Sequence, residues 1–116
     1  MKRIYIAGPY SADNVMDVLH NIRRGTELSY KVFTLGFAPF CPWLDFHYVL
    51  MDHDNKLTIN DFYQYSIAWL KVSDAVILAP GWGKSKGTLE EIRIAKDMGI
   101  PVFKNVAELI NFYSKT

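Results

Sequence analysis

The chain has 116 residues, of which 50% are hydrophobic and 22% are charged, and its net charge is +1. This composition is typical of one folded domain and excludes an intrinsically disordered chain. The 13 basic and 12 acidic residues nearly balance, which argues against a dedicated binder of nucleic acid polymers or of membrane surfaces. The one cysteine, Cys41, cannot form an internal disulfide, so we expect a reducing, cytoplasmic location.

No run of residues approaches the roughly 20 apolar positions that a membrane span needs. The basic start of the chain precedes an apolar run over residues 4–7, which ends at Gly8 and Pro9 and is too short for a signal peptide. We therefore expect a single domain over residues 1–116 without a membrane partner.

The first third of the chain predicts a strand, a long helix and a second strand. Residues 4–7 are a short apolar run that ends at a Gly-Pro pair, which is typical of a buried strand. Asp13 or Asn14 can cap a helix whose apolar positions keep helical spacing until Gly36. Residues 37–41 are a second apolar run, in which a proline favours an irregular or edge position.

The remainder continues the alternation after one irregular segment. Residues 42–57 are aromatic and then polar, and we expect a loop with a turn of helix there. Thr58 can cap the next helix. The later elements are predicted as a helix to about residue 72, a strand over 74–79, a glycine-rich loop over 80–86, a helix over 88–98, a strand over 101–104 and a helix over 105–114.

Strands that alternate with helices pair in parallel through right-handed crossovers. We therefore predict an α/β domain in three layers, with a four- or five-stranded, mainly parallel sheet. Ligands in such folds bind at the carboxyl ends of the strands. Two turns fall there, at residues 8–11 and 80–87, and together they predict the site.

The second turn has the composition of a phosphate-binding loop without the spacing of a known one. A P-loop needs glycine at position 78, where this chain has leucine, and the dinucleotide fingerprint is one residue shorter than this loop. Small residues before a helix N-terminus, with Lys84 and Lys86, still suit a phosphate group. A plain loop with two solvated lysines is the alternative, and the sequence leaves both open.

Two adjacent glutamates open the helix after this loop. At about 100° per residue, Glu91 falls within the apolar arc of the helix, whereas Glu90 falls on the solvated face. Glu91 can fold back on the Thr88 amide in a capping box. Alternatively, the helix N-terminus holds Glu91 ionised and aims it into the ligand crevice as a nucleophile.

Three segments carry a resemblance to a known family: the I-Y-I-A-G-P-Y run at 4–10, the S-D-A-V-I-L run at 73–78 and the residues 85–95. They resemble the nucleoside 2-deoxyribosyltransferase-like superfamily, which includes 2-deoxyribosyltransferases and 2′-deoxynucleoside 5′-monophosphate N-glycosidases. Residues 42–57 have no match in it. The resemblance implies a flavodoxin-like fold and cleavage of the N-glycosidic bond of a nucleoside or its 5′-monophosphate, by hydrolysis or by base transfer.

The resemblance also implies roles for individual residues. Glu91 completes the family's G-x-x-x-E pattern and would attack C1′ of the sugar, and Tyr5 would contact the reacting groups. The substrate would be bound at Gly8, Pro9, Tyr10, Ser11, Ser85 and Gly87. We add Lys84 for a 5′-phosphate, and Trp82, Trp43 or Tyr10 for stacking on the base. The family needs no cofactor and no metal ion, and its members form homodimers or larger homo-oligomers.

One position departs from the family. An aspartate usually stands eight residues before the aspartate that starts the third strand, and here that position is Ser66, on an inward-facing stripe. Serine cannot protonate a departing base at neutral pH. Either Asp61, Asp45 or His47 substitutes, or the chain is a non-catalytic nucleotide-binding module. An unrelated flavodoxin-like regulator, whose loop binds another phosphorylated ligand, is a third interpretation.

Overall fold

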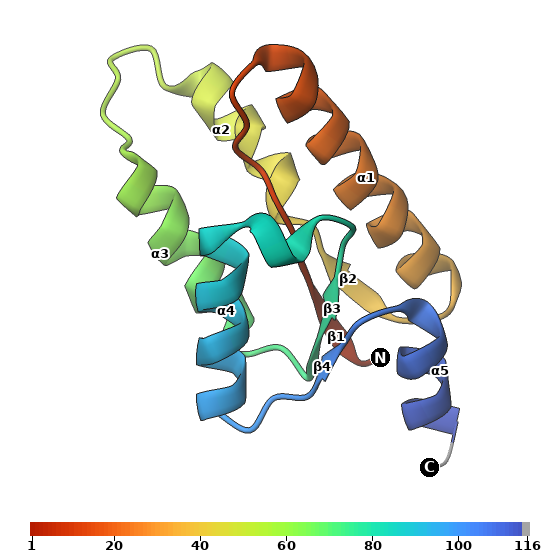
Figure 1. The fold of residues 1–116 in the computed structure, drawn as a ribbon. Helices are drawn as coiled ribbons and strands as arrows, with labels where there is room; N and C mark the ends of the chain where they lie inside the picture. The colour runs from red at the N-terminus through yellow and green to blue at the C-terminus, as the bar shows by residue number, and fades with distance from the viewer. Residues whose placement is uncertain (115–116) are drawn as a thin grey trace.

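The computed structural model describes residues 1–114 as an alternation of strands and helices (Figure 1). The strands are β1 (Arg3–Ala7), β2 (Ala38–Phe40), β3 (Ala75–Leu78) and β4 (Val102–Phe103). The α-helices are α1 (Val15–Thr34), α2 (Phe46–Met51), α3 (Ile59–Leu70), α4 (Lys86–Asp97) and α5 (Val106–Ser114). Two short 3-10 helices are η1 (Pro42–Asp45) and η2 (Trp82–Lys84).

The four strands form one parallel sheet in the order β2-β1-β3-β4. This confirms the predicted α/β class, with the strand order and layers of a flavodoxin-like domain. The short strand β2 lies at an edge of the sheet, as its proline predicted, because an edge strand does not need every backbone N–H for pairing.

Helices cover both faces of the sheet, and alternate side chains of each strand point to opposite faces. Ile4 and Ile6 of β1 pack in the cluster with α1 and α5. Tyr5 and Ala7 pack in the other cluster, with α3 and α4. Figure 1 shows α1 and α5 on one side of the strands and α3 and α4 on the other. Tyr5 is therefore directed toward α4, the helix that carries both glutamates.

The helix caps follow the sequence, with one correction. The Asn14 side chain accepts the Asp17 amide at the start of α1, and Gly36 has a φ of +94° just after its end. Thr58 forms a capping box with Asp61 at the start of α3. Helix α4 begins at Lys86, two residues before its predicted start, because the Ser85 hydroxyl caps it by accepting the Thr88 amide at 3.2 Å.

Residues 42–57 contain more helix than predicted, since η1 and α2 occupy most of the segment. Trp43 anchors it to the core. Its side chain is 1% exposed, and its indole Nε1 donates a 2.9 Å hydrogen bond to the carbonyl of Pro9. Trp43 is thus mainly a core side chain, and it also lines the cavity described below, so stacking of its indole on a bound base stays a prediction.

Gly25, in the middle of α1, makes room for this indole, because a Cβ at Gly25 would clash with the Trp43 ring. Gly25→Ala is therefore expected to destabilise the fold by roughly 1–3 kcal/mol, although alanine is the better helix former. The matched control is Gly87→Ala, in the first turn of α4, where a Cβ meets nothing within 4 Å. Urea unfolding of both variants measures the difference, and equal stabilities would contradict the packing argument.

Candidate active site

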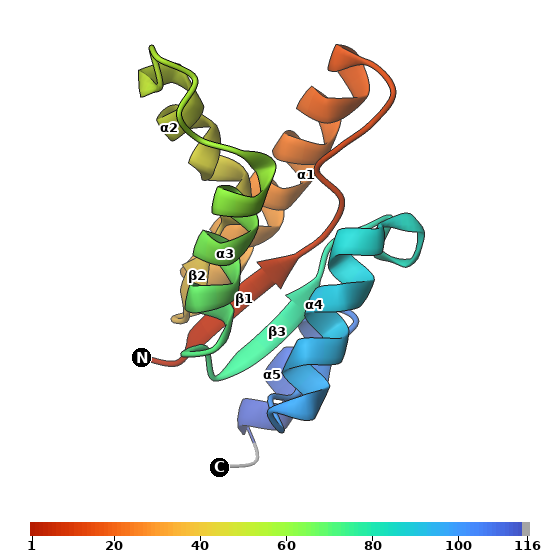
Figure 2. The same ribbon diagram turned by 90° about the vertical axis from the view of Figure 1, so that its left-hand side faces the viewer.

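A cavity of about 980 Å³ lies where β1 and β3 end. Figure 2 shows these two strands pointing toward the same end of the molecule, where α1 and α4 begin. The cavity is lined by residues from β1 and the loop after it, from α1, η1, α2 and α3, and from the segment 81–88. Its volume is within the range of small-molecule sites, which is roughly 300–1,000 Å³.

Glu91 and Tyr5 form the central contact of the cavity. The Tyr5 hydroxyl donates a short hydrogen bond to Oε2 of Glu91, and both side chains line the cavity. Tyr5 is fully buried, and Glu91 is mostly buried. Within residues 1–114, no salt bridge involves Glu91. The site thus holds a carboxyl group that is largely shielded from water and hydrogen-bonded to a neutral hydroxyl.

Burial governs the protonation of this pair. Desolvation raises the pKa of Glu91 to about 7, although the hydrogen bond from Tyr5 acts in the opposite direction. Near neutral pH the acid and the carboxylate of Glu91 therefore coexist, so that the ionised form is present but is not the sole one. Burial, and next the charge of Glu91, raise the pKa of Tyr5 well above its ordinary value, so that Tyr5 keeps its proton.

The capping-box interpretation of Glu91 is also wrong. The Thr88 amide donates to the hydroxyl of Ser85, and the Glu91 carboxylate accepts from Tyr5 across the cavity. Glu90 behaves as the helical pattern predicted, since it pairs with Arg93 on the solvated face. The two adjacent glutamates therefore have different environments, and only Glu91 lines the cavity.

Most of the residues singled out in the sequence come together here. The cavity is lined by Tyr5, Gly8, Pro9, Tyr10, Ser11, Ser66, Lys84, Ser85, Gly87 and Glu91. Trp82 does not line it, but packs against the cluster between the sheet and α3 and α4. Ser66 also contacts Tyr5, and the hydrogen bond between their side chains lowers the pKa of Tyr5, against the stronger effect of burial.

Sequence reasoning missed part of the lining. Asn21 and Arg24, one helical turn apart on α1, line the cavity, and the amide of Asn21 donates to the carbonyl of Tyr10 at 3.1 Å. A buried asparagine on a largely apolar helix face was the available signal. Phe62 of α3 is a further lining residue that the sequence did not indicate, whereas its neighbour Tyr63 lies on the predicted inward-facing stripe through Ser66.

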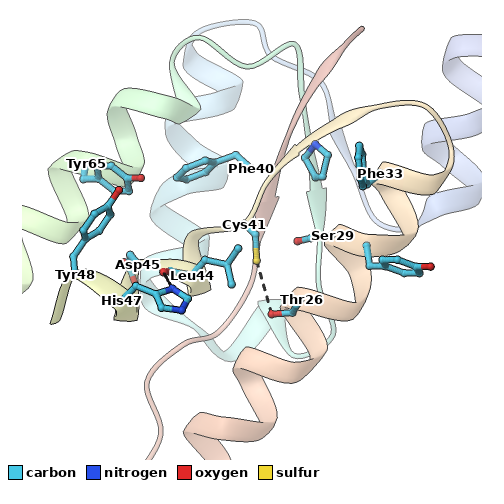
Figure 3. A pocket seen from close by; sticks show the side chains of 12 residues that line it. Thr26, Ser29, Phe33, Phe40, Cys41, Leu44, Asp45, His47, Tyr48 and Tyr65 are labelled. Carbon is cyan, nitrogen blue, oxygen red and sulfur yellow. Dashed lines mark hydrogen bonds between the residues drawn. The ribbon is translucent and has the colours of Figure 1, made fainter. Parts of the chain in front are cut away.

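A second, smaller pocket of about 540 Å³ lies beside the edge strand β2 (Figure 3). His47 and Cys41 line it, whereas Tyr5 and Glu91 do not. Figure 3 shows Cys41 directed toward Thr26 of α1, with Asp45 and His47 on the segment that follows β2. Asp45 lines both pockets and therefore lies between them.

Within residues 1–114, no group of three His, Cys, Asp or Glu side chains is arranged to hold a metal ion. None of the helices in this part of the chain has the length and apolar character of a bilayer crossing.

The fold has a solved counterpart. The structure of a 2-deoxyribosyltransferase from the psychrotolerant bacterium Bacillus psychrosaccharolyticus matches with a TM-score of 0.57 and 16% sequence identity, over 86% of this chain and 69% of that chain. At this identity the likeness establishes the fold. Curated proteins provide no match to the sequence. The model of a domain of unknown function, DUF7768, matches residues 2–105, and the chain therefore belongs to that family.

Proposed function

We propose that the protein cleaves the N-glycosidic bond of a nucleoside or a (deoxy)nucleoside 5′-monophosphate, with Glu91 as the nucleophile. The observation that carries the proposal is the Tyr5–Glu91 pair in the cavity. Burying a carboxyl group away from water and away from a cationic partner is unfavourable, so its retention needs a reason. A site that binds an electrophilic carbon next to this carboxylate supplies one.

The chemistry has two steps. Ionised Glu91 attacks C1′ as the bond to the base breaks, through an oxocarbenium-like transition state, and a glycosyl ester forms. Tyr5 holds the attacking carboxylate in position with its hydroxyl proton. Water that attacks C1′ then gives hydrolysis, and a second base gives transfer. The solved 2-deoxyribosyltransferase with the same fold supports this reaction class, to which the resemblance in residues 4–10 and 85–95 also points.

The 5′ end of the substrate would lie at the start of α4. Ser85, Lys84 and Lys86 line the cavity at the N-terminus of this twelve-residue helix, where the backbone dipole also favours an anion. Arg24 adds a fourth polar group, from α1. We therefore propose that 5′-monophosphates are preferred over free nucleosides.

A substrate panel tests the proposal. Purified protein is incubated with matched nucleosides and 5′-monophosphates, and free base is measured by chromatography. We expect base release, with a kcat/KM at least tenfold higher for the monophosphates, since a charge-assisted contact contributes about 1.5–3 kcal/mol. Lys84→Met should remove most of that preference, while Lys96→Met, on the same helix but outside the cavity, should keep it.

A non-catalytic nucleotide-binding module is the second candidate, and Ser66 in place of an aspartate favours it. The same panel separates the two candidates. A binding module would raise its melting temperature with nucleotides and release no base, and that result would contradict the proposed activity.

We also propose that the chain works as a homo-oligomer. Helix α2 exposes a run of large apolar side chains, and Ile59 at the start of α3 is 90% exposed. Val49, Leu57 and Ile59 also line the cavity. A second copy of the chain that covers them would close the site over the base. The exposed residues of this surface are Tyr48, Val49, Leu50, Met51, Leu57 and Ile59.

A further inference from the structure

We propose that Asp45 is the acid that protonates the departing base, in place of the aspartate that Ser66 replaces. The inference rests on the proposed function and names the residue that completes its chemistry. The observation behind it is that Asp45 and Glu91 line the same cavity, although they are 46 positions apart in the chain. Glycosidic cleavage by carboxyl groups generally uses two of them, one at the carbon and one at the leaving group.

The segment that carries Asp45 is fixed in place. Asp45 is the last residue of η1, two positions after Trp43. The buried indole of Trp43 packs where Gly25 leaves space, and it is hydrogen-bonded to the carbonyl of Pro9, which follows β1. The side chain of Asp45 therefore projects from an anchored turn, and an anchored turn can hold an acid at a constant distance from the sugar.

The electrostatic neighbourhood of Asp45 includes the catalytic candidates. Burial is the main reason that the pKa values of Tyr5 and Tyr10 are raised, and the negative charge of Asp45 adds to the effect, least of all the causes for Tyr5; both tyrosines line the cavity. Burial raises the pKa of Asp45 itself to about 6, from an ordinary value of 3.8. A minor fraction of Asp45 therefore keeps its proton near neutral pH, and the reactive molecules are those in which Asp45 is protonated while Glu91, whose pKa is about 7, is ionised.

The other acids named in the sequence are excluded by their contacts. Asp61 is exposed and accepts the amide and hydroxyl of Thr58 in the capping box, so it serves the helix start. His47 is exposed, its Nδ1 lies 2.9 Å from the carbonyl of Leu44, and it lines the smaller pocket only. Ser66 lines the larger cavity but has no acidic proton at neutral pH.

The proposed step balances. As the bond between C1′ and the base breaks, its electron pair goes to the base nitrogen, and the carboxyl proton of Asp45 goes to the base. An oxygen of Glu91 forms the new bond to C1′. In the second step, Asp45 takes a proton from the attacking water, the C1′–O bond to Glu91 breaks, and both carboxyl groups return to their starting states.

The test uses a leaving group that needs no proton. Asp45→Asn is compared with the wild type on a guanine nucleotide and on its N7-methylated counterpart, whose base carries a positive charge and departs without protonation. We expect a loss of about 10²- to 10⁴-fold in kcat on the ordinary base and less than about tenfold on the methylated base. Asp54→Asn, at an exposed aspartate in the same segment that lines neither pocket, should behave as the wild type on both.

Each outcome decides the matter. Equal losses on both substrates, or no loss on either, would overturn the assignment of Asp45. Asp45→Glu keeps a carboxyl group and should recover part of the rate on the ordinary base, so the result does not depend on one variant. If the wild-type protein releases no base from any member of the substrate panel or from the methylated nucleotide, the proposed function fails, and the role of Asp45 fails with it. If the wild type is active and Asp45→Asn changes the rate on the two substrates by the same factor, the role of Asp45 is rejected and the proposed function stands.

Discussion

Glu91→Gln is expected to reduce base release by roughly 10³-fold or more, because an amide cannot form the glycosyl ester. The substitution keeps the length of the side chain, and the amide oxygen can still accept the hydrogen bond from Tyr5. Binding of the substrate should therefore remain, with the loss in kcat. The measurement is free base released per enzyme with the best substrate of the panel, at matched protein concentrations.

Glu90→Gln is the matched control, since Glu90 is adjacent in the sequence and lies outside the cavity. It pairs with Arg93 on the solvent side of α4, and its pKa is lowered by the hydrogen bond from that arginine. Surface ion pairs contribute little to stability, so the control should fold and react as the wild type does. Equal activity of the two variants would remove Glu91 from the mechanism.

Glu91→Gln is also expected to stabilise the fold above neutral pH, by up to about 3 kcal/mol. The folded-state pKa of Glu91 is about 7, against an ordinary value of 4.5. The folded protein thus holds this proton more tightly than the unfolded chain. Stability is highest below pH 4.5, falls as the pH rises from 4.5 to 7, and stays reduced above that range.

Urea unfolding at pH 5 and at pH 8 measures this effect. In the wild type the carboxylate at position 91 must be buried as an ion at pH 8, whereas the glutamine variant has no ion to bury. The difference between the two proteins should therefore be small at pH 5 and large at pH 8. The same difference at both values would mean that the burial of Glu91 does not raise its pKa. Glu90→Gln again provides the control, with a difference that does not grow with pH.

The two predictions have opposite signs for one residue, and this combination distinguishes a functional carboxylate from a structural one. If Glu91 were a capping residue, as the sequence allowed, its substitution would lower the free energy of unfolding of the protein at every pH where the glutamate is ionised. If Glu91 is a buried nucleophile, its substitution should lower the activity of the protein and raise its stability, because burying the ionised carboxylate destabilises the fold.

The local elements of the fold could be predicted from the sequence because their signals lie within a few residues. Asn14 and Thr58 cap helices through side chains that reach the next turn, and Gly36 and Gly99 adopt the positive φ that ends a helix. The sequence also placed Glu91 on the inward side of α4. Helical periodicity depends on neighbours alone, and the signal was therefore sufficient.

The residues that only the tertiary structure brought together are far apart in the chain. Nothing near Trp43 indicated that its indole would fill the space left by Gly25 and donate to Pro9, and so fix Asp45 beside the cavity. Nothing near Glu91 indicated that Tyr5 would reach it from β1, or that burial would raise the pKa of Glu91 to about 7. The sequence by itself determined the order of strands and helices and the inward side of α4, since both follow from short-range geometry. The tertiary structure decided contacts and protonation, because desolvation depends on all the atoms that surround a group, whatever their distance along the chain.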